Sequence, residues 1–157
     1  METIIDKLAA TGISPQQPLS FRKVLSVKEN GKEYRLTMNP EMKSASYQVD
    51  GSILKVGNRC DKLVVVEKVT DGWTEIFVEL KGKDISHAIE QLESTMCNPL
   101  FKHVSVVDIR ARIVGQSIPR NTGSSILERA KVNFIKRYRC DLRAASGVYK
   151  EDIRGTF

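Results

Sequence analysis

A chain of 157 residues, 41% hydrophobic and 28% charged, is long enough to bury its own core, and this balance excludes a disordered or membrane-embedded protein. No apolar run approaches the ~20 residues of a membrane span, and the first residues lack the basic segment of a signal peptide. Three scattered cysteines, Cys60, Cys97 and Cys140, favour neither a disulfide framework nor a zinc site. We therefore expect a cytoplasmic protein that does not bind membranes.

The formal net charge of +6 is concentrated in the C-terminal third of the chain. The stretch from Lys102 to Arg143 holds ten basic and three acidic residues, a net charge of +7, which leaves −1 for the rest. A basic region of this kind suggests a polyanionic partner, nucleic acid above all. The alternative is a solvated basic surface without a partner.

The N-terminal part is predicted to hold one helix and several strands. Apolar residues spaced for one helical face predict a short amphipathic helix at 2–10. An Asn-Gly dipeptide between two strand-like segments predicts a hairpin with strands at 21–27 and 33–38. Segment 39–57 is rich in turn residues and is expected to hold a short strand near 53–56.

The central part predicts a second hairpin and then a helix. Residues 61–69 are β-branched and apolar, and residues 73–81 again resemble a strand. Asp84 is expected to cap a helix that runs to about Met96, whose apolar residues follow the spacing of one helical face. A long strand is predicted at 102–114.

A polar loop at 115–123 and a basic helix at 124–139 complete the predicted elements. Their order predicts an α/β fold with a mixed central β-sheet flanked by helices. We expect one domain over residues 1–157, with a core at about 20–114.

Candidate catalytic residues converge on the second hairpin. Glu79 and Lys81 are two residues apart on a strand, so their side chains share a face. A three-residue loop at 70–72 would place Asp61 opposite Lys81 and diagonal to Glu79, on that same face. A two-residue loop would turn Asp61 to the other face.

Two carboxylates at a strand end make an oxygen-rich site suited to Mg²⁺, with Mn²⁺ as a substitute. A neighbouring lysine can orient a water nucleophile or stabilise charge on a phosphate. Gln91, on the following helix, could hydrogen-bond the nucleophile or the phosphate. The alternative is a surface pair between Glu79 and Lys81 at the edge of a sheet.

Residues 60–65 (CDKLVV) and 77–82 (FVELKG), with the helix that carries Gln91, resemble the PD-(D/E)xK nuclease superfamily. The resemblance covers roughly residues 53–114, in the order strand, strand, helix, strand. It implies a restriction-endonuclease-like fold. Cys60 stands where the motif has proline, at a position that does no chemistry.

The resemblance also implies roles for individual residues. Asp61 and Glu79 would be metal ligands together with the backbone carbonyl of Leu80, Lys81 would be the catalytic lysine, and Gln91 would be the accessory residue. Many members also supply a glutamate from the first helix, a role left unassigned here.

The sequence thus predicts a Mg²⁺-dependent endonuclease that hydrolyses phosphodiester bonds in DNA. The resemblance also implies a homodimer, because cutting both strands needs two sites. The alternative is a nucleic-acid-binding module on the same fold that recognises or assembles without cleavage. In either case we expect phosphate contacts from the basic C-terminal third, namely Arg120, Arg129, Lys131, Lys136, Arg137 and Arg139.

Overall fold

The computed structural model describes residues 2–51, 53–54, 57, 59–68, 72–82, 84–116 and 124–155, without the side chains of residues 81, 82, 124 and 125. The helices and strands follow one another in this order: α1 (Ile4–Ala10), β1 (Gln17–Phe21), β2 (Val24–Glu29), β3 (Lys32–Thr37), β4 (Lys43–Gln48), β5 (Lys62–Glu67), β6 (Trp73–Gly82), α2 (Ile85–Met96), the 3-10 helix η1 (Pro99–Phe101), β7 (Val106–Gly115), α3 (Ser124–Tyr138), β8 (Cys140–Ser146) and β9 (Val148–Asp152).

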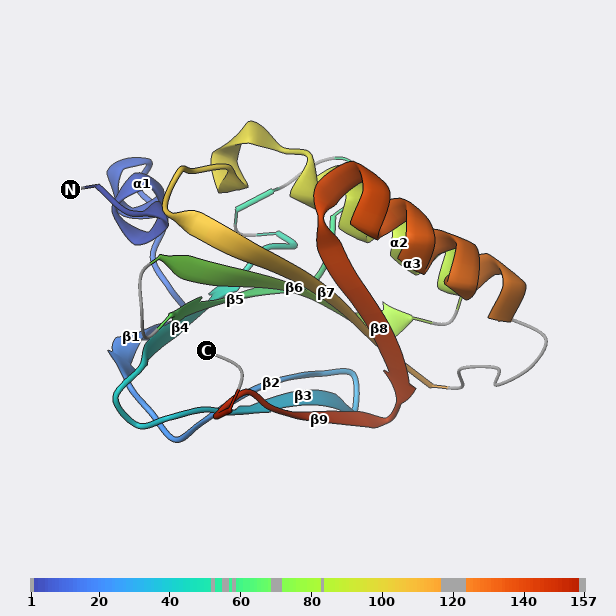
Figure 1. The fold of residues 1–157 in the computed structure, drawn as a ribbon, viewed down its shortest axis with the longest axis horizontal. Coiled ribbons are helices and arrows are strands. Elements are labelled where there is room, and N and C mark those ends of the chain that lie inside the picture. The colour runs from blue at the N-terminus through green and yellow to red at the C-terminus, as the bar shows by residue number, and fades with distance from the viewer. Residues whose placement is uncertain are drawn as a thin grey trace.

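A six-stranded mixed sheet forms the centre of the molecule, with the strand order β1-β4-β5-β6-β7-β8 (Figure 1). The pairs β1–β4, β4–β5 and β5–β6 are antiparallel, and β6–β7 and β7–β8 are parallel. Helices α2 and α3 supply the crossover connections that the two parallel pairs require.

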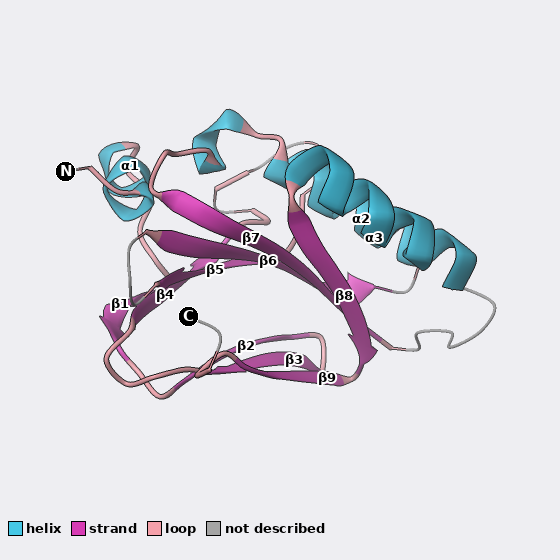
Figure 2. Cartoon of the chain, viewed as in Figure 1, coloured by secondary structure: helices cyan, strands magenta, loops and turns pink. Residues whose placement is uncertain are grey.

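A second, three-stranded sheet of order β2-β3-β9 lies against the other face of the large sheet, so the molecule has three layers (Figure 2). The predicted α/β fold with a mixed sheet flanked by helices is confirmed. Among the described residues, no helix is long and apolar enough to cross a membrane.

Alternate residues of β6 enter two separate cores, because successive side chains of a strand point to opposite faces. Phe77 packs under α2 and α3 with Leu92 and Phe134. Ile76 and Val78 pack against the small sheet. The face of β6 that carries its odd-numbered residues therefore looks toward the helices.

Several local predictions are confirmed. Asn30 and Gly31 both have positive φ, at 53° and 74°, as a two-residue hairpin turn between β2 and β3 requires. The side chain of Asp84 accepts a hydrogen bond from the backbone N–H of Ser86 and caps α2. The helix predicted at 2–10 is present as α1, and Thr3 and Asp6 form a capping box at its start, which was not predicted.

Other elements differ from the predictions. Strands β1, β4, β8 and β9 were not predicted, and β7 begins at Val106 rather than at residue 102. The expected strand near 53–56 is reduced to an isolated bridge between Asp50 and Leu54, and residues 55–56 lie outside the described residues. The unpredicted strands are short or carry charges, and long-range pairing holds them in place.

Candidate active site at the end of strand β6

The register of the β5–β6 hairpin brings Asp61 to Glu79. Lys62 pairs with Val78, so Asp61, the next residue outward, is opposite Glu79. Side chains opposite each other in an antiparallel pair have Cβ atoms about 4.5–5.5 Å apart. The two carboxylates therefore belong to one site at this end of the hairpin.

The predicted position of the loop, at 70–72 with residue 69 paired to Trp73, is wrong. Trp73 pairs with Glu67, and residues 69–71 of the connection lie outside the described residues. The backbone N–H of Lys68 donates to the carbonyl of Gly72 at 2.9 Å, and Gly72 has φ of +87°. The register moves by two residues, so Asp61 keeps its predicted face but is opposite Glu79 and not Lys81.

Strand β6 carries a β-bulge directly after Glu79. Glu79 pairs with Ile113 and Gly82 pairs with Gly115, so β6 has one more residue than β7 over this interval. Leu80 and Lys81 occupy the bulge; the side chain of Lys81 lies outside the described part. Bulges often occur beside active sites, where they re-aim side chains or end strand pairing.

Asp61 and Glu79 are both buried, each with 1% of its surface exposed. Asp61 Oδ2 accepts a hydrogen bond from the backbone N–H of Leu80 at 2.7 Å, which ties the start of β5 to the bulge. Burial, followed by the negative charges of Glu79 and Asp61, raises the pKa of the Cys60 thiol well above its usual value. Both carboxylates are therefore near the buried thiol of Cys60.

Gln91 lies beside this site and holds the segment that leads into Asp61. Its Nε2 donates to the carbonyl of Arg59 at 3.2 Å. One turn further along α2, Thr95 Oγ1 accepts from the backbone N–H of Cys60 at 2.9 Å. Gln91 thus positions the chain before Asp61. Sequence reasoning missed Thr95, whose only signal is a hydroxyl on the buried face of α2.

The donor atoms at this end of β6 fit a hard divalent cation, because carboxylate and carbonyl oxygens are the ligands that Mg²⁺ accepts. Asp61 and Glu79 supply the carboxylates, and the Leu80 carbonyl belongs to the adjoining bulge. Across the described residues, no group of three or more His, Cys, Asp or Glu side chains forms a metal cluster.

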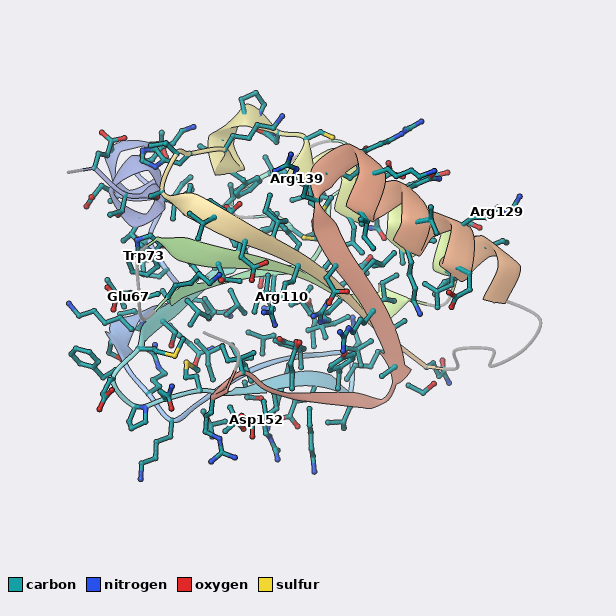
Figure 3. All side chains as sticks on the ribbon, in the orientation of Figure 1. Glu67, Trp73, Arg110, Arg129, Arg139 and Asp152 are labelled. Atoms are coloured by element: carbon teal, nitrogen blue, oxygen red, sulfur yellow. The ribbon has the colours of Figure 1, made fainter. Side chains whose placement is uncertain are left out.

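Helix α3 presents basic side chains on its outer side. Leu127, Ala130 and Phe134 bury one face of the helix. Figure 3 shows Arg129 and Arg139 toward opposite ends of α3. Arg129 and Lys136 are exposed on the outer side, and Lys131 pairs with Glu128 at 3.1 Å. Arg137 is also exposed, but it continues the line of the buried residues and lies beside Tyr138 at the end of the helix; Arg139 follows the last residue of α3 and is exposed. Arg120 lies outside the described residues.

Three arginines of the basic stretch form ion pairs with carboxylates of this chain. Arg112 is completely buried, and its guanidinium pairs with Glu151 at 2.8 Å and Asp141 at 3.0 Å. Arg110 pairs with Asp108, and Arg143 shares Asp141, each at 3.0 Å. The positive charge available to a partner is therefore carried mainly by α3.

Comparisons with known proteins assign no relative to this chain. No protein-family model matches the sequence, and no match is found among curated proteins or among solved structures. The class that fold and site define is an α/β protein with a buried carboxylate pair at a bulged strand end and a basic outer helix. Its function must be inferred from that geometry.

Proposed function

We propose that this protein is a metal-dependent nuclease with a restriction-endonuclease-like fold that hydrolyses phosphodiester bonds in DNA. The observation that carries the proposal is the placement of Asp61 opposite Glu79 beside the bulge at Leu80 and Lys81. Two carboxylates brought together in a buried site repel each other unless a cation or proton compensates them. A divalent cation provides that compensation.

Each residue at the site has a distinct role in the proposed reaction. Asp61 and Glu79 would hold Mg²⁺ or Mn²⁺ together with the Leu80 carbonyl, and the bound cation would supply positive charge for a phosphate and a water nucleophile. Lys81 would stabilise charge on the attacked phosphate. Gln91 would keep the segment before Asp61 in place through its hydrogen bond to Arg59.

The basic outer side of α3 would bind the phosphate backbone. A homodimer would bring two such sites to the two strands of a duplex, which is why we favour an endonuclease. The cysteines Cys60, Cys97 and Cys140 are all free. A reducing compartment such as the cytoplasm would suit them.

Incubation of the purified protein with supercoiled, linear, branched and single-stranded DNA, each with Mg²⁺, Mn²⁺ or EDTA, tests the proposal. We expect cleavage of at least one substrate with either cation and none with EDTA. RNA substrates of the same forms establish whether the activity is confined to DNA. Absence of cleavage across the whole panel would reject the nuclease.

Burial of Asp61 and Glu79 favours one second candidate, a nucleic-acid-binding module on the same fold that does not cleave. Carboxylates with so little exposed surface could serve the fold alone, through contacts such as the hydrogen bond that Asp61 accepts from the Leu80 N–H. That candidate predicts salt-sensitive DNA binding with no metal-dependent product.

Substitutions beside the carboxylates should separate catalysis from positioning. Lys81→Ala is expected to reduce cleavage strongly while largely preserving metal binding, because lysine acts on the phosphate and not on the cation. Gln91→Ala should reduce cleavage less, since its amide reaches only the backbone at Arg59. Cleavage rates and calorimetric titration with Mg²⁺ measure the two effects. Equal losses of metal affinity in both variants would contradict this division of roles.

Removing charge from α3 should weaken DNA binding and its dependence on salt. Arg129 and Lys136 are two helical turns apart on the exposed side, so Arg129→Ala with Lys136→Ala removes two neighbouring phosphate contacts. Each lost contact lowers the slope of log K against log salt by about 0.9 on duplex DNA, so the slope should flatten by up to about two.

Fluorescence anisotropy on two unrelated duplexes at several salt concentrations measures this slope. Affinity should fall equally on both duplexes, because phosphate contacts do not read sequence. The matched control is Lys28→Ala with Lys150→Ala, two exposed lysines of the small sheet. An unchanged slope in the α3 variant, or an equal change in the control, would remove α3 from the interface.

A further inference from the structure

A cavity of about 290 Å³ lies at the other end of β6, on the helix-facing side of the large sheet. The ends of α2 and α3, the segment around η1 and the starts of β6 and β7 enclose it. Its apolar wall includes Phe101 and Ile109, and Tyr138 closes one side. Figure 2 shows the C-terminal end of α3 and the segment before β7 on the same side of the sheet.

A buried carboxyl group faces this cavity. Glu75 is 2% exposed, yet its Oε2 accepts no hydrogen bond from any described residue. Burial raises the pKa of Glu75 to about 8, offset in part by the charge of Lys7. The Lys7 ammonium itself donates to the carbonyls of Pro99 and Lys102, at 2.8 and 2.7 Å. A buried carboxyl without a donor is costly to the fold, which is typical of a group kept for a ligand.

The rim of the cavity is positively charged, because Lys102 and Arg137 line it and are both exposed. Both cations line the same cavity as Glu75, but they are exposed to solvent whereas Glu75 is buried. A ligand that satisfies both ends must therefore be elongated. It needs N–H donors at its inner end, a flat apolar middle and an anionic outer end.

We propose that this cavity binds a guanine nucleotide. Guanine offers two adjacent donors, N1–H and the N2 amino group, and they match the two oxygens of the Glu75 carboxylate. The purine ring would lie between the apolar wall and Tyr138, and the phosphate would meet Arg137 and Lys102 at the rim. The cavity volume of about 290 Å³ is just below the range of about 300–1,000 Å³ for small-molecule pockets, so it suits a ligand no larger than a mononucleotide.

The site is separate from the candidate active site. Glu75 and Glu79 are four residues apart on one strand, or about 13 Å at ~3.3 Å per residue. Guanine binding therefore does not depend on the proposed cleavage and can be measured with EDTA present. The ligand is either a free mononucleotide or the 5′-terminal guanine nucleotide of a DNA strand.

Isothermal titration calorimetry in EDTA at about pH 8.5, where Glu75 is mostly ionised, tests the site. The titrants are GMP, guanosine and AMP. We expect GMP to bind, and guanosine and AMP each to bind about tenfold more weakly, because one lacks the phosphate and the other lacks the paired donors. A 5′-phosphorylated oligonucleotide that begins with dG distinguishes a strand end from a free nucleotide, according to which probe binds more tightly.

Two substitutions give the decisive readout. Glu75→Gln keeps the shape but presents one donor and one acceptor, which suits adenine, so the preference should shift from GMP toward AMP by about tenfold. Arg137→Ala should weaken GMP but not guanosine. Glu90→Gln, on the exposed side of α2, is the control and should match the wild type. The proposal is overturned if neither GMP nor the oligonucleotide binds at about 1 mM, or if Glu75→Gln leaves the preference unchanged.

Discussion

Glu79→Ala is expected to abolish metal-dependent cleavage. Glu79 is opposite Asp61 in the hairpin register and precedes the bulge, so its carboxylate is central to the proposed cation site. A catalytic cation contributes several kcal/mol to stabilisation of the transition state, and 1.36 kcal/mol corresponds to a factor of ten in rate. The cleavage rate should therefore fall by about a thousandfold or more, as measured on whichever DNA the wild type cuts best.

Three further variants make this result interpretable. Glu79→Gln keeps the size of the side chain, so an equal loss of activity in a folded protein assigns the effect to charge. Asp61→Asn is preferable to Asp61→Ala, because the Leu80 N–H needs an acceptor and an unsatisfied buried donor costs about 1–3 kcal/mol. Glu90→Ala, on the exposed side of α2, is the matched control. Full activity in Glu79→Ala would refute the nuclease assignment.

The shared face of Asp61 and Glu79 could be predicted from sequence, although their pairing could not. Side chains alternate with a period of two, so a register that is shifted by two residues from the expected one leaves the face unchanged. The loop length depends on where the turn closes, and here the Lys68 N–H bonds to the Gly72 carbonyl. Nothing in the local sequence determines that closure.

Strand β9 shows that a strand can form without the hydrophobic periodicity from which strands are predicted. Strand β9 is short and mostly polar, and it forms because it pairs in parallel with β3, more than a hundred residues earlier. Its Glu151 accepts from the buried Arg112 and from the hydroxyl of Tyr34. Sequence reasoning counted Arg112 in the basic stretch because it had no β9 to supply the partner. The count of basic residues still supports the prediction of a basic surface at α3, where Arg129 and Lys136 are exposed.

Sequence reasoning also missed Glu75, because it relied on a motif that includes only Glu79. Strand β6 carries Glu75 and Glu79 on the same face within one apolar run, and both are buried. Only Glu79 precedes a lysine at the spacing of a known motif, so motif reasoning selects it alone. The cost of burying a carboxyl group is an independent criterion for a candidate functional residue, and it selects Glu75 as well as Glu79.

Glu75→Gln is expected to stabilise the protein, by an amount that grows with pH. Burial raises the pKa of Glu75 to about 8 in the folded state, against 4.5 for an ordinary glutamate. Below pH 4.5 the carboxyl is protonated in both states. Between the two values the unfolded chain releases a proton that the folded protein retains, so wild-type stability falls by about 1.4 kcal/mol per pH unit. Above the folded pKa both states are ionised and the loss is complete.

Glutamine does not titrate, so the variant should gain about 3–5 kcal/mol over the wild type by pH 8 and little at pH 4.5. Urea unfolding of both proteins at several pH values measures the difference. Other titrating groups cancel in that difference, including those that line the same cavity or lie beside it: Lys7, Cys97, Lys102, His103, Arg137 and Tyr138. The exposed Glu90→Gln should differ from the wild type by the same small amount at every pH. If Glu75→Gln behaves in the same way, Glu75 is solvated in solution, and the cavity loses the unsatisfied carboxyl group that makes it a candidate binding site.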